Sequence, residues 1–225
     1  NFVNNICKTI TKSTVLTFKG NDSTADAADA LLAYLISPLE KKKIAVIGVG
    51  NIGSKVILKL VERGYDIFIA RSKLSNAKKT ANAINVIKPK YCLSTAKAKK
   101  LSNIAENMDV LIGFSRGIPI ISEKMILQMN KNGLILDGGL GTIKPNLVSM
   151  AQEKNIKIIR LDIRAAFAAT TELLFETKRL VEETMGSINY SNVEIIAGGV
   201  YGKLGDAVVD SITKPTQFIG FADGM

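Results

Sequence analysis

Histidine is absent from the 225 residues of this chain, and cysteine occurs only twice. Without histidine, the chain alone cannot build a serine–histidine–acid site, a cysteine–histidine site or a histidine-ligated zinc site. Cys7 and Cys92 have no metal-ligand spacing, so we expect two unpaired thiols, no metal and a cytoplasmic location. Any proton transfer must use lysine, aspartate, glutamate, tyrosine, cysteine or water.

Long hydrophobic runs are also missing. The longest, residues 44–49 and 110–114, are far shorter than the roughly 20 residues that a membrane-spanning helix needs, so we expect a soluble protein without a membrane partner. The chain starts at Asn1 with no basic, apolar leader pattern, which is typical of a trimmed or partly observed chain. A hydrophobic content of 47% suffices for one large domain, or for a domain and a smaller lobe.

Positive charge is plentiful, with a formal net charge of +10. The lysines are dispersed, with short clusters at residues 41–43 and 97–100, and no aromatic-rich strand motif accompanies them. A solvated face that attracts an anionic cofactor explains the charge more simply than nucleic-acid binding does. We therefore expect no nucleic-acid partner.

From residue 43 onward, short apolar runs alternate with longer amphipathic stretches. This alternation predicts an α/β fold, namely a doubly wound, mostly parallel Rossmann-type sheet with helices on both faces. The expected strands are residues 44–47, 66–70, 109–113, 134–137 and 157–161, with a weaker one near 90–93. The expected helices are residues 52–63, 74–83, 96–107, 122–129 and 145–154.

The flanks of this alternating block differ from it. Residues 1–38 contain a short or incomplete N-terminal segment and a linking helix at 21–37, which fits part of a truncated lobe. Residues 39–164 form the expected nucleotide-binding domain. Residues 165–225 comprise a long helix at 165–185 and a small Gly-rich extension with strands near 193–197, 207–209 and 217–221.

A G-x-G-x-x-G motif follows the first expected strand. Gly48 permits the tight turn, Gly50 lets the backbone approach a pyrophosphate, and Gly53 lets the helix lie close to the strand. The amides at the helix start, at Asn51 and Ile52, then face the anion with the helix dipole behind them. The alternative is a Gly-rich packing turn in a fold that has lost its ligand.

The end of the second strand discriminates between dinucleotides. An NAD site usually has an acid there for the ribose 2′-hydroxyl, but this chain has Arg71, Ser72 and Lys73. A guanidinium with a hydroxyl and a second cation suits a 2′-phosphate, so NADP is favoured over NAD. The alternative is an ordinary exposed arginine.

Two later strand ends are expected to face the nicotinamide, because ligands lie beyond the carboxyl ends of the strands in open α/β sheets. Phe114 and Ser115 follow one strand and line the ring, while Gly138 and Gly139 follow the other and let the backbone pass close to it. The alternative is that these glycines only make turns.

Together these residues resemble the NADP-binding half of the shikimate dehydrogenase and methylenetetrahydrofolate dehydrogenase group, over roughly residues 23–162. The resemblance rests on the glycine motif after its strand, on Arg71-Ser72, and on Asp109-Val-Leu-Ile-Gly followed by Gly133-Leu-Ile-Leu-Asp-Gly-Gly. It implies NADP and hydride transfer to or from a small carbonyl, alcohol, amine or imine carbon. The family's catalytic lysine has no matching position here. Asp26, in a loose match to the family's Asn-Thr-Asp element, is a candidate acid, against the alternative of an acid in the first turns of a helix.

The C-terminal loops match no family. Tyr201 and Lys203 offer a proton donor and a cation near a carbonyl oxygen, and Asp206 or Asp210 can orient them. Plain surface turns are the alternative reading.

The leading hypothesis is an NADP-dependent dehydrogenase or reductase of a small polar metabolite, acting as a homo-oligomer. The rival hypothesis is a non-catalytic NAD(P)-binding or sensing module that docks on a catalytic partner. A fragment of a longer dehydrogenase makes the same cofactor prediction.

Overall fold

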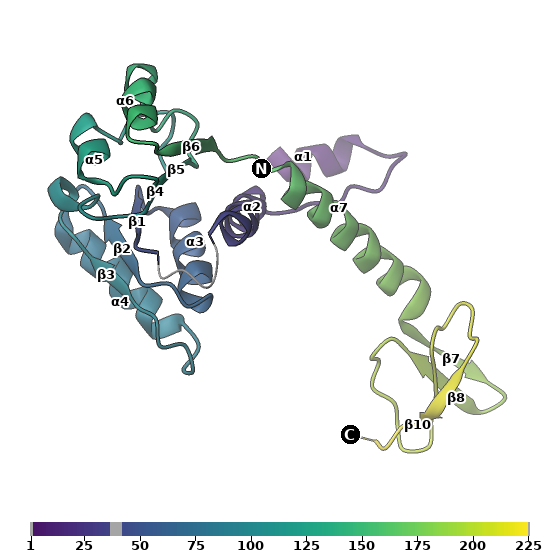
Figure 1. The fold of residues 1–225 in the computed structure, drawn as a ribbon. Coiled ribbons are helices and arrows are strands. Elements are labelled where there is room, and N and C mark those ends of the chain that lie inside the picture. The colour runs from purple at the N-terminus through teal and green to yellow at the C-terminus, as the bar shows by residue number, and fades with distance from the viewer. Residues whose placement is uncertain (1, 37–41, 225) are drawn as a thin grey trace. The chain divides into compact units, whose positions relative to one another are not determined.

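A computed structural model of the protein describes residues 2–36 and 42–224. The chain divides into two compact units, Lys19–Phe167 and a second unit made of Asn1–Phe18 with Ala168–Met225. Helix α7, Arg164–Arg179, begins in the first unit and continues in the second (Figure 1). The domain boundary expected at residues 38–39 and Lys41 of the lysine cluster lie outside the described residues.

The first unit is built on a parallel sheet with the strand order β3-β2-β1-β4-β5-β6. Its strands are β1 (Ile44–Ile47), β2 (Ile67–Ala70), β3 (Ala96–Ala98), β4 (Val110–Gly113), β5 (Leu134–Asp137) and β6 (Lys157–Arg160). The strand order reverses between β1 and β4, where Ile44 is paired with both Ile67 and Val110. This is the doubly wound Rossmann arrangement, so the predicted fold class is confirmed.

Helices cover both faces of this sheet (Figure 1). Side chains alternate across β1: Ile44 and Val46 belong to one buried cluster, and Ala45 and Ile47 belong to another. The first cluster contains residues of α2 (Gly20–Leu35), α3 (Asn51–Glu62) and α4 (Leu74–Ile87). The second contains residues of α5 (Glu123–Gln128) and α6 (Val148–Glu153). The residues of β1 are thus buried on both sides, as parallel sheets require.

Helix α2 belongs to this unit because it packs along α3. Its small apolar side chains Ala25 and Ala28 are buried, and Leu32 completes the buried face. Three ion pairs run beside this face, namely Asp22–Lys55, Asp26–Lys59 and Asp29–Arg63. Exposed ion pairs each contribute little to stability, so we assign most of the stabilisation between α2 and α3 to the apolar face. The three ion pairs then fix how far along α3 the helix α2 lies.

Two sequence expectations about the third strand are wrong. Residues 90–93 form a turn and coil, and the strand lies further on, at Ala96–Ala98. A helix was expected at residues 96–107, but this range contains the strand and, after it, a single 3₁₀ turn at Leu101–Asn103. The Asn85 side chain accepts from the Ala96 amide and donates to its carbonyl, both at 2.9 Å, and Ala96 is paired with Ile67 on β2. Tertiary pairing here overrides the helix propensity of an Ala- and Lys-rich segment.

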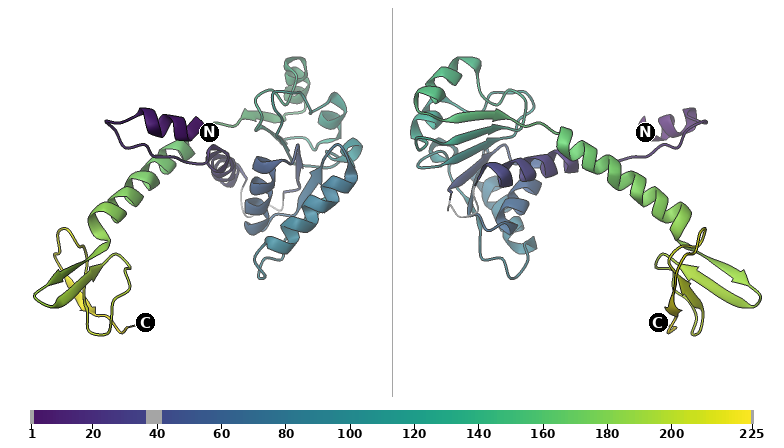
Figure 2. Two further views of the ribbon diagram at one scale, coloured as in Figure 1. Left: turned by 180° about the vertical axis from the view of Figure 1, so that it is seen from behind. Right: turned by 45° about the vertical axis from the view of Figure 1, so that its right-hand side comes forward.

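The second unit carries a small mixed sheet with the order β10-β9-β8-β7 (Figure 2). Its elements are α1 (Phe2–Thr9), the π-helical end of the long helix (Leu180–Thr184), β7 (Gly186–Tyr190), β8 (Val193–Ala197), β9 (Ala207–Val209) and β10 (Phe218–Phe221). Strand β7 was not anticipated from the sequence. It pairs with β8 through a turn at Ser191 and Asn192, which both have positive φ as a tight hairpin turn demands.

Burial is sparse in this second unit. Among its described residues only Ile196 and Ala197 are buried, whereas Tyr190, Phe218 and Phe221 are exposed. Of the helices in the described part of the chain, none has the length and apolar character to cross a membrane.

Candidate functional site

The candidate site lies at the carboxyl ends of β1 and β4, where the strand order reverses. After β1 the chain turns at Gly48, with φ +80°, and the Gly50 amide donates to the Gly48 carbonyl at 2.9 Å. Helix α3 then begins at Asn51, and the Ser54 amide donates to the Gly50 carbonyl at 3.0 Å. The amides of Asn51, Ile52 and Gly53 precede this bond, so they lie at the open, positive end of the helix dipole.

The three motif glycines have different steric surroundings. A Cβ on Gly48 would lie 1.7 Å from the Phe114 carbonyl oxygen, and one on Gly53 would lie 3.3 Å from the Gly48 carbonyl oxygen. Gly50 is different: a Cβ there would meet no protein atom within 4 Å, and its extended backbone (φ −94°, ψ −151°) suits any residue. The protein's own packing therefore explains Gly48 and Gly53 but not Gly50.

Two cavities adjoin this loop and share Gly48 and Gly50. The first, of about 400 Å³, is lined by Ile47, Gly48, Val49, Gly50, Arg71, Ser72, Leu101 and Ile120. The second, of about 230 Å³, is lined by Asn21, Gly48, Gly50, Asn51, Ile52, Gly53, Phe114, Ser115, Arg116 and Gly138. The structure thus brings together every predicted cofactor residue except Lys73 and Gly139 as lining of two adjoining spaces.

The first cavity has a basic rim, and no carboxylate is among the lining residues that the structure describes. Arg71 directly follows β2, is half-buried, and donates through Nη1 to Thr80 Oγ1 of α4 at 3.1 Å. Ser72 and Lys73 are exposed, and Lys73 directly precedes α4. One bond leaves the other N–H donors of the Arg71 guanidinium available to an anion.

The loops after β4 and β5 lie in close contact at the second cavity. A Cβ on Gly138 would lie 2.3 Å from the Phe114 ring, and one on Gly139 would lie 2.3 Å from the Ser115 carbonyl oxygen. Only glycine fits at either position. Packing between the loops thus requires both glycines, independently of any contact with a cofactor ring.

Asp137 organises the loop after β5. Its buried carboxylate accepts from the amides of Gly139 (3.2 Å), Gly141 (2.8 Å) and Thr142 (3.2 Å), and from the Thr142 hydroxyl (2.9 Å). Burial by itself would raise the pKa of Asp137, but these hydrogen bonds outweigh it and hold the pKa below its ordinary value. The bonds keep Leu140 in its positive-φ conformation (+56°).

A larger cavity, of about 860 Å³, lies beside β5 and β6. It is lined mainly by apolar residues, among them Ile143, Val148 and Ile156, and its one carboxylate is Asp137. Asp137 is already bonded to its own loop, so the other charged groups of the described lining are the cations Lys157 and Arg160 of β6.

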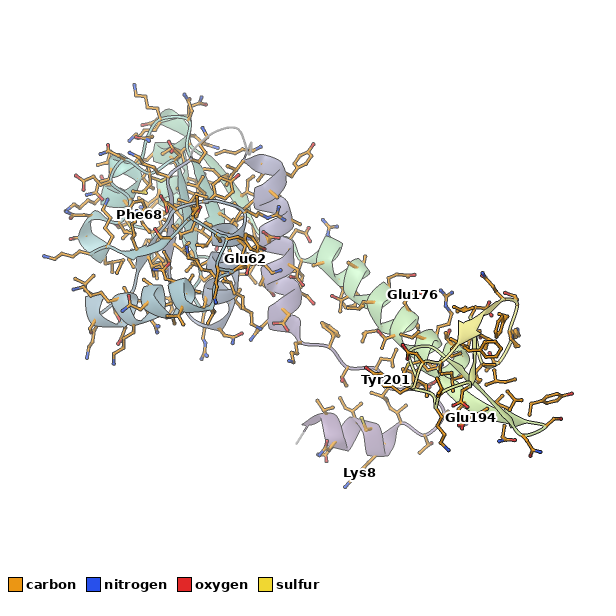
Figure 3. All side chains as sticks on the ribbon, turned by 90° about the horizontal axis from the view of Figure 1, so that it is seen from below. Lys8, Glu62, Phe68, Glu176, Glu194 and Tyr201 are labelled. Carbon is orange, nitrogen blue, oxygen red and sulfur yellow. The ribbon has the colours of Figure 1, made fainter. Side chains whose placement is uncertain are left out.

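None of the candidate catalytic residues Asp26, Tyr201, Lys203 and Asp206, nor the alternative Asp210, is among the described lining of either motif cavity. Asp26 pairs with Lys59 at 2.9 Å on the α2–α3 surface, and its hydrogen bond is the main cause of the raised pKa of Lys59. Tyr201 lies in the C-terminal unit, where Figure 3 labels it. Its side chain is 87% exposed, and the Lys203 amide donates to Asp206 Oδ2 at 2.6 Å. The structure brings Lys203 and Asp206 together within one turn. The catalytic role of all four residues stays a prediction.

Six lining residues were not among the predicted cofactor residues. Ile47 and Val49 belong to the predicted strand and glycine motif, and the other four lie elsewhere. Leu101 was placed within an expected helix, and Ile120 lies in a loop with no motif of its own. Asn21 comes from the start of α2, where its Nδ2 donates to Asn51 Oδ1 at 3.2 Å. Arg116 directly follows Ser115, so its place after β4 was a signal that could have been used.

Comparison with known proteins agrees with this geometry. Residues 43–113 match the family model described as "NADP oxidoreductase coenzyme F420-dependent". A glutamyl-tRNA reductase from Caldivirga maquilingensis is 27% identical over 143 residues, which are 62% of this chain and 33% of that protein. The chain thus spans about a third of the curated relative that it matches.

Solved structures resemble the chain in fold. A chorismate mutase/shikimate 5-dehydrogenase fusion protein from Clostridium acetobutylicum has a TM-score of 0.51 at 15% identity, covering 68% of this chain and 55% of that chain. L-tryptophan dehydrogenase from Nostoc punctiforme also scores 0.51, at 17% identity, with coverages of 72% and 50%. The chain spans about half of each. The predicted resemblance to a shikimate dehydrogenase-like Rossmann domain is confirmed at the level of the fold.

Proposed function

We propose that this protein is an NADP-dependent dehydrogenase or reductase of a small polar metabolite. The observation that carries the proposal is Gly50, a glycine that the protein's own packing does not require and that lines both cavities at the start of α3. Such a glycine fits a pyrophosphate lying against the backbone. The family model matched by residues 43–113 supports the oxidoreductase class.

The two cavities suit the two halves of the cofactor. The adenosine half would lie between Leu101, Ile120 and Arg71, and the pyrophosphate would meet the amides of Asn51 and Ile52. The nicotinamide half would lie in the second cavity, whose lining includes Phe114. When bound, the cofactor would supply or accept the hydride, and the residues of the two cavities would position the cofactor.

The choice of NADP over NAD rests on the end of β2. Arg71 and Ser72 line the first cavity, and the exposed Lys73 follows them. The described lining of this cavity has no carboxylate to hold a ribose 2′-hydroxyl, whereas a guanidinium and a hydroxyl can hold a 2′-phosphate.

The rival function is a binding or sensing module that docks on a catalytic partner. A specific observation favours it: the described lining of the second cavity contains no lysine, tyrosine or carboxylate that could move a proton. Under the leading proposal that group must come from outside this described lining. Turnover of a small carbonyl compound with NADPH would favour the enzyme over the module.

The proposal includes a cytoplasmic location, which suits the free thiols of Cys7 and Cys92. It also includes self-association through α7. Leu173 lies in α7 and Leu180 directly follows it, at the start of the π-helical end. The two lie seven residues apart, and therefore on one side of the long helix, and both are exposed. In the described part of the chain, α7 makes no extensive contact with another helix or strand. A helix of this length is marginal alone in water, so a second copy of it is a suitable partner.

Calorimetric titration of NADPH and NADH into the wild type and Arg71→Ala tests the cofactor assignment. We expect the wild type to prefer NADPH, and the variant to lose about 1–3 kcal/mol of NADPH binding free energy with no change for NADH. Lys124→Ala, on the remote helix α5, is the matched control and should bind both as the wild type does. Equal affinity for the two cofactors, or none for either, contradicts the assignment.

A further inference from the structure

Arg116 is a cation that the proposed cofactor does not account for. It lines the second cavity and is the only charged residue in the described lining of that cavity. It is exposed, and its guanidinium has no hydrogen-bond or ion-pair partner among residues 2–36 and 42–224. The pyrophosphate already has the amides of α3, and a 2′-phosphate has Arg71.

The backbone that carries Arg116 is held firmly. The Ser115 hydroxyl donates to the Ile118 carbonyl at 2.6 Å across the turn, and Gly117 between them has φ +72°. The Gly117 amide donates to the Gly139 carbonyl at 3.3 Å, and Gly139 lies so close to Ser115 that no side chain fits there. An arginine needed only for solubility would require no such turn, whereas one that positions a ligand benefits from a fixed origin.

The surroundings of Arg116 favour an anion. The second cavity shares Asn21 and Asn51 with a neighbouring space of about 530 Å³ that is also lined by Lys19 and Lys55. No carboxylate is among the described residues that line either space. Three cations line these two spaces. Lys55 is paired with Asp22, whereas Lys19 and Arg116 have no ion pair with a described carboxylate.

We propose that Arg116 binds the carboxylate of a small anionic substrate at the nicotinamide end of the cleft. This inference rests on the proposed function, and it names the substrate class of the same site. A guanidinium holds a carboxylate through two parallel N–H···O bonds, which fixes the orientation of the substrate as well as its charge. The substrate's reacting carbon then lies beside the carboxylate, over the cavity that holds the cofactor ring.

The test follows the Arg116 side-chain Nε–H resonance of the whole chain, saturated with NADPH, by NMR. Oxamate is titrated as the carboxylate probe, and oxamide is titrated as its uncharged analogue. The resonance is assigned by its loss in Arg116→Gln. We expect a saturable shift with oxamate and no shift with oxamide. We also expect the NADPH affinity of Arg116→Gln to stay within about twofold of the wild type, because the proposed phosphate contacts do not include Arg116.

Arg164→Gln is the matched control, because Arg164 is exposed on the same unit and lines neither motif cavity. It should leave the oxamate titration unchanged. Equal shifts with oxamate and oxamide, a response to inorganic phosphate in place of oxamate, or a tenfold loss of NADPH affinity in Arg116→Gln would each overturn the assignment. Failure of the wild type to bind NADPH contradicts the proposed function as well, whereas normal NADPH binding without an oxamate response contradicts only this inference.

Discussion

The two units of the chain differ most in what they bury. In Lys19–Phe167, strands such as β1 and β4 are buried on both faces, and α3 contributes Val56, Ile57 and Leu60 to the same core. In the second unit only Ile196 and Ala197 are buried among the described residues. Burial of apolar area drives folding. The first unit therefore gains much stability from its own core, and the second unit, which leaves most of its apolar side chains exposed, gains little.

The two units do not differ in how they fix their loops, because each has a loop held by hydrogen bonds to an aspartate. Asp137 holds its loop in the first unit through four hydrogen bonds. In the second unit Asp210 accepts from the Thr216 hydroxyl and amide and from the Gln217 amide, and these bonds lower the pKa of Asp210 to about 2. Both units therefore fix loops with an aspartate, and the difference between them lies in apolar burial.

A pair of leucine truncations would sharpen the comparison most. Leu60→Ala, at a fully buried position of α3, should lower the free energy of unfolding by about 2–5 kcal/mol through lost burial and a cavity. Leu173→Ala, at a position of α7 that is 66% exposed, should change it by no more than about 0.5 kcal/mol at protein concentrations too low for self-association. Urea unfolding followed by circular dichroism measures both, and equal losses would break the distinction between the units.

The exposed face of α7 gives the next effect. Leu180→Lys places a charge on the side proposed to meet a second copy, and should weaken self-association about tenfold or more in sedimentation velocity, since an unpaired charge would lie in an apolar contact. Thr171→Lys introduces the same charge nine residues before Leu180, on the opposite side of the helix, and should weaken self-association much less. A wild type that is monomeric at every concentration contradicts the proposed dimer.

The smallest effect is a pH dependence from Asp137. Its pKa is lowered on folding, so it stabilises the folded state above the unfolded value of about 3.9, and this contribution is lost as the pH falls through the folded pKa. Asp137→Asn should therefore be less stable than the wild type at pH 7, with the gap narrowing below about pH 4. Glu153→Gln, at an exposed position of α6, should show no such gap. A gap that is constant with pH would contradict the assigned hydrogen bonds.

Local pattern predicted much of this fold and site. The strand at 44–47, the glycine turn and the helix after it were all visible because their signals are contiguous in the sequence. Strand β3 was misplaced because its position depends on Asn85 and on pairing with β2, which are distant in sequence.

Residues that join the site from elsewhere were also missed for a physical reason. Asn21 lines the second cavity only because α2 packs on α3, and the charge pairs that set this register are 30 or more residues apart. Likewise, the steric demand for Gly138 comes from Phe114 on another strand end. Sequence reasoning assigned that glycine to the cofactor ring, whereas its closest requirement is the protein's own packing.

The central claim is that a glycine stands at position 50 so that the pyrophosphate of a dinucleotide can approach the backbone. Gly50→Ala tests this claim most directly. Its thermal melting and NADPH affinity would be measured beside those of Gly48→Ala, whose Cβ would strike the Phe114 carbonyl. We predict that Gly50→Ala melts as the wild type does but binds NADPH at least about tenfold more weakly, a loss of about 1.4 kcal/mol, while Gly48→Ala loses stability. Wild-type NADPH affinity in a normally folded Gly50→Ala would contradict the claim.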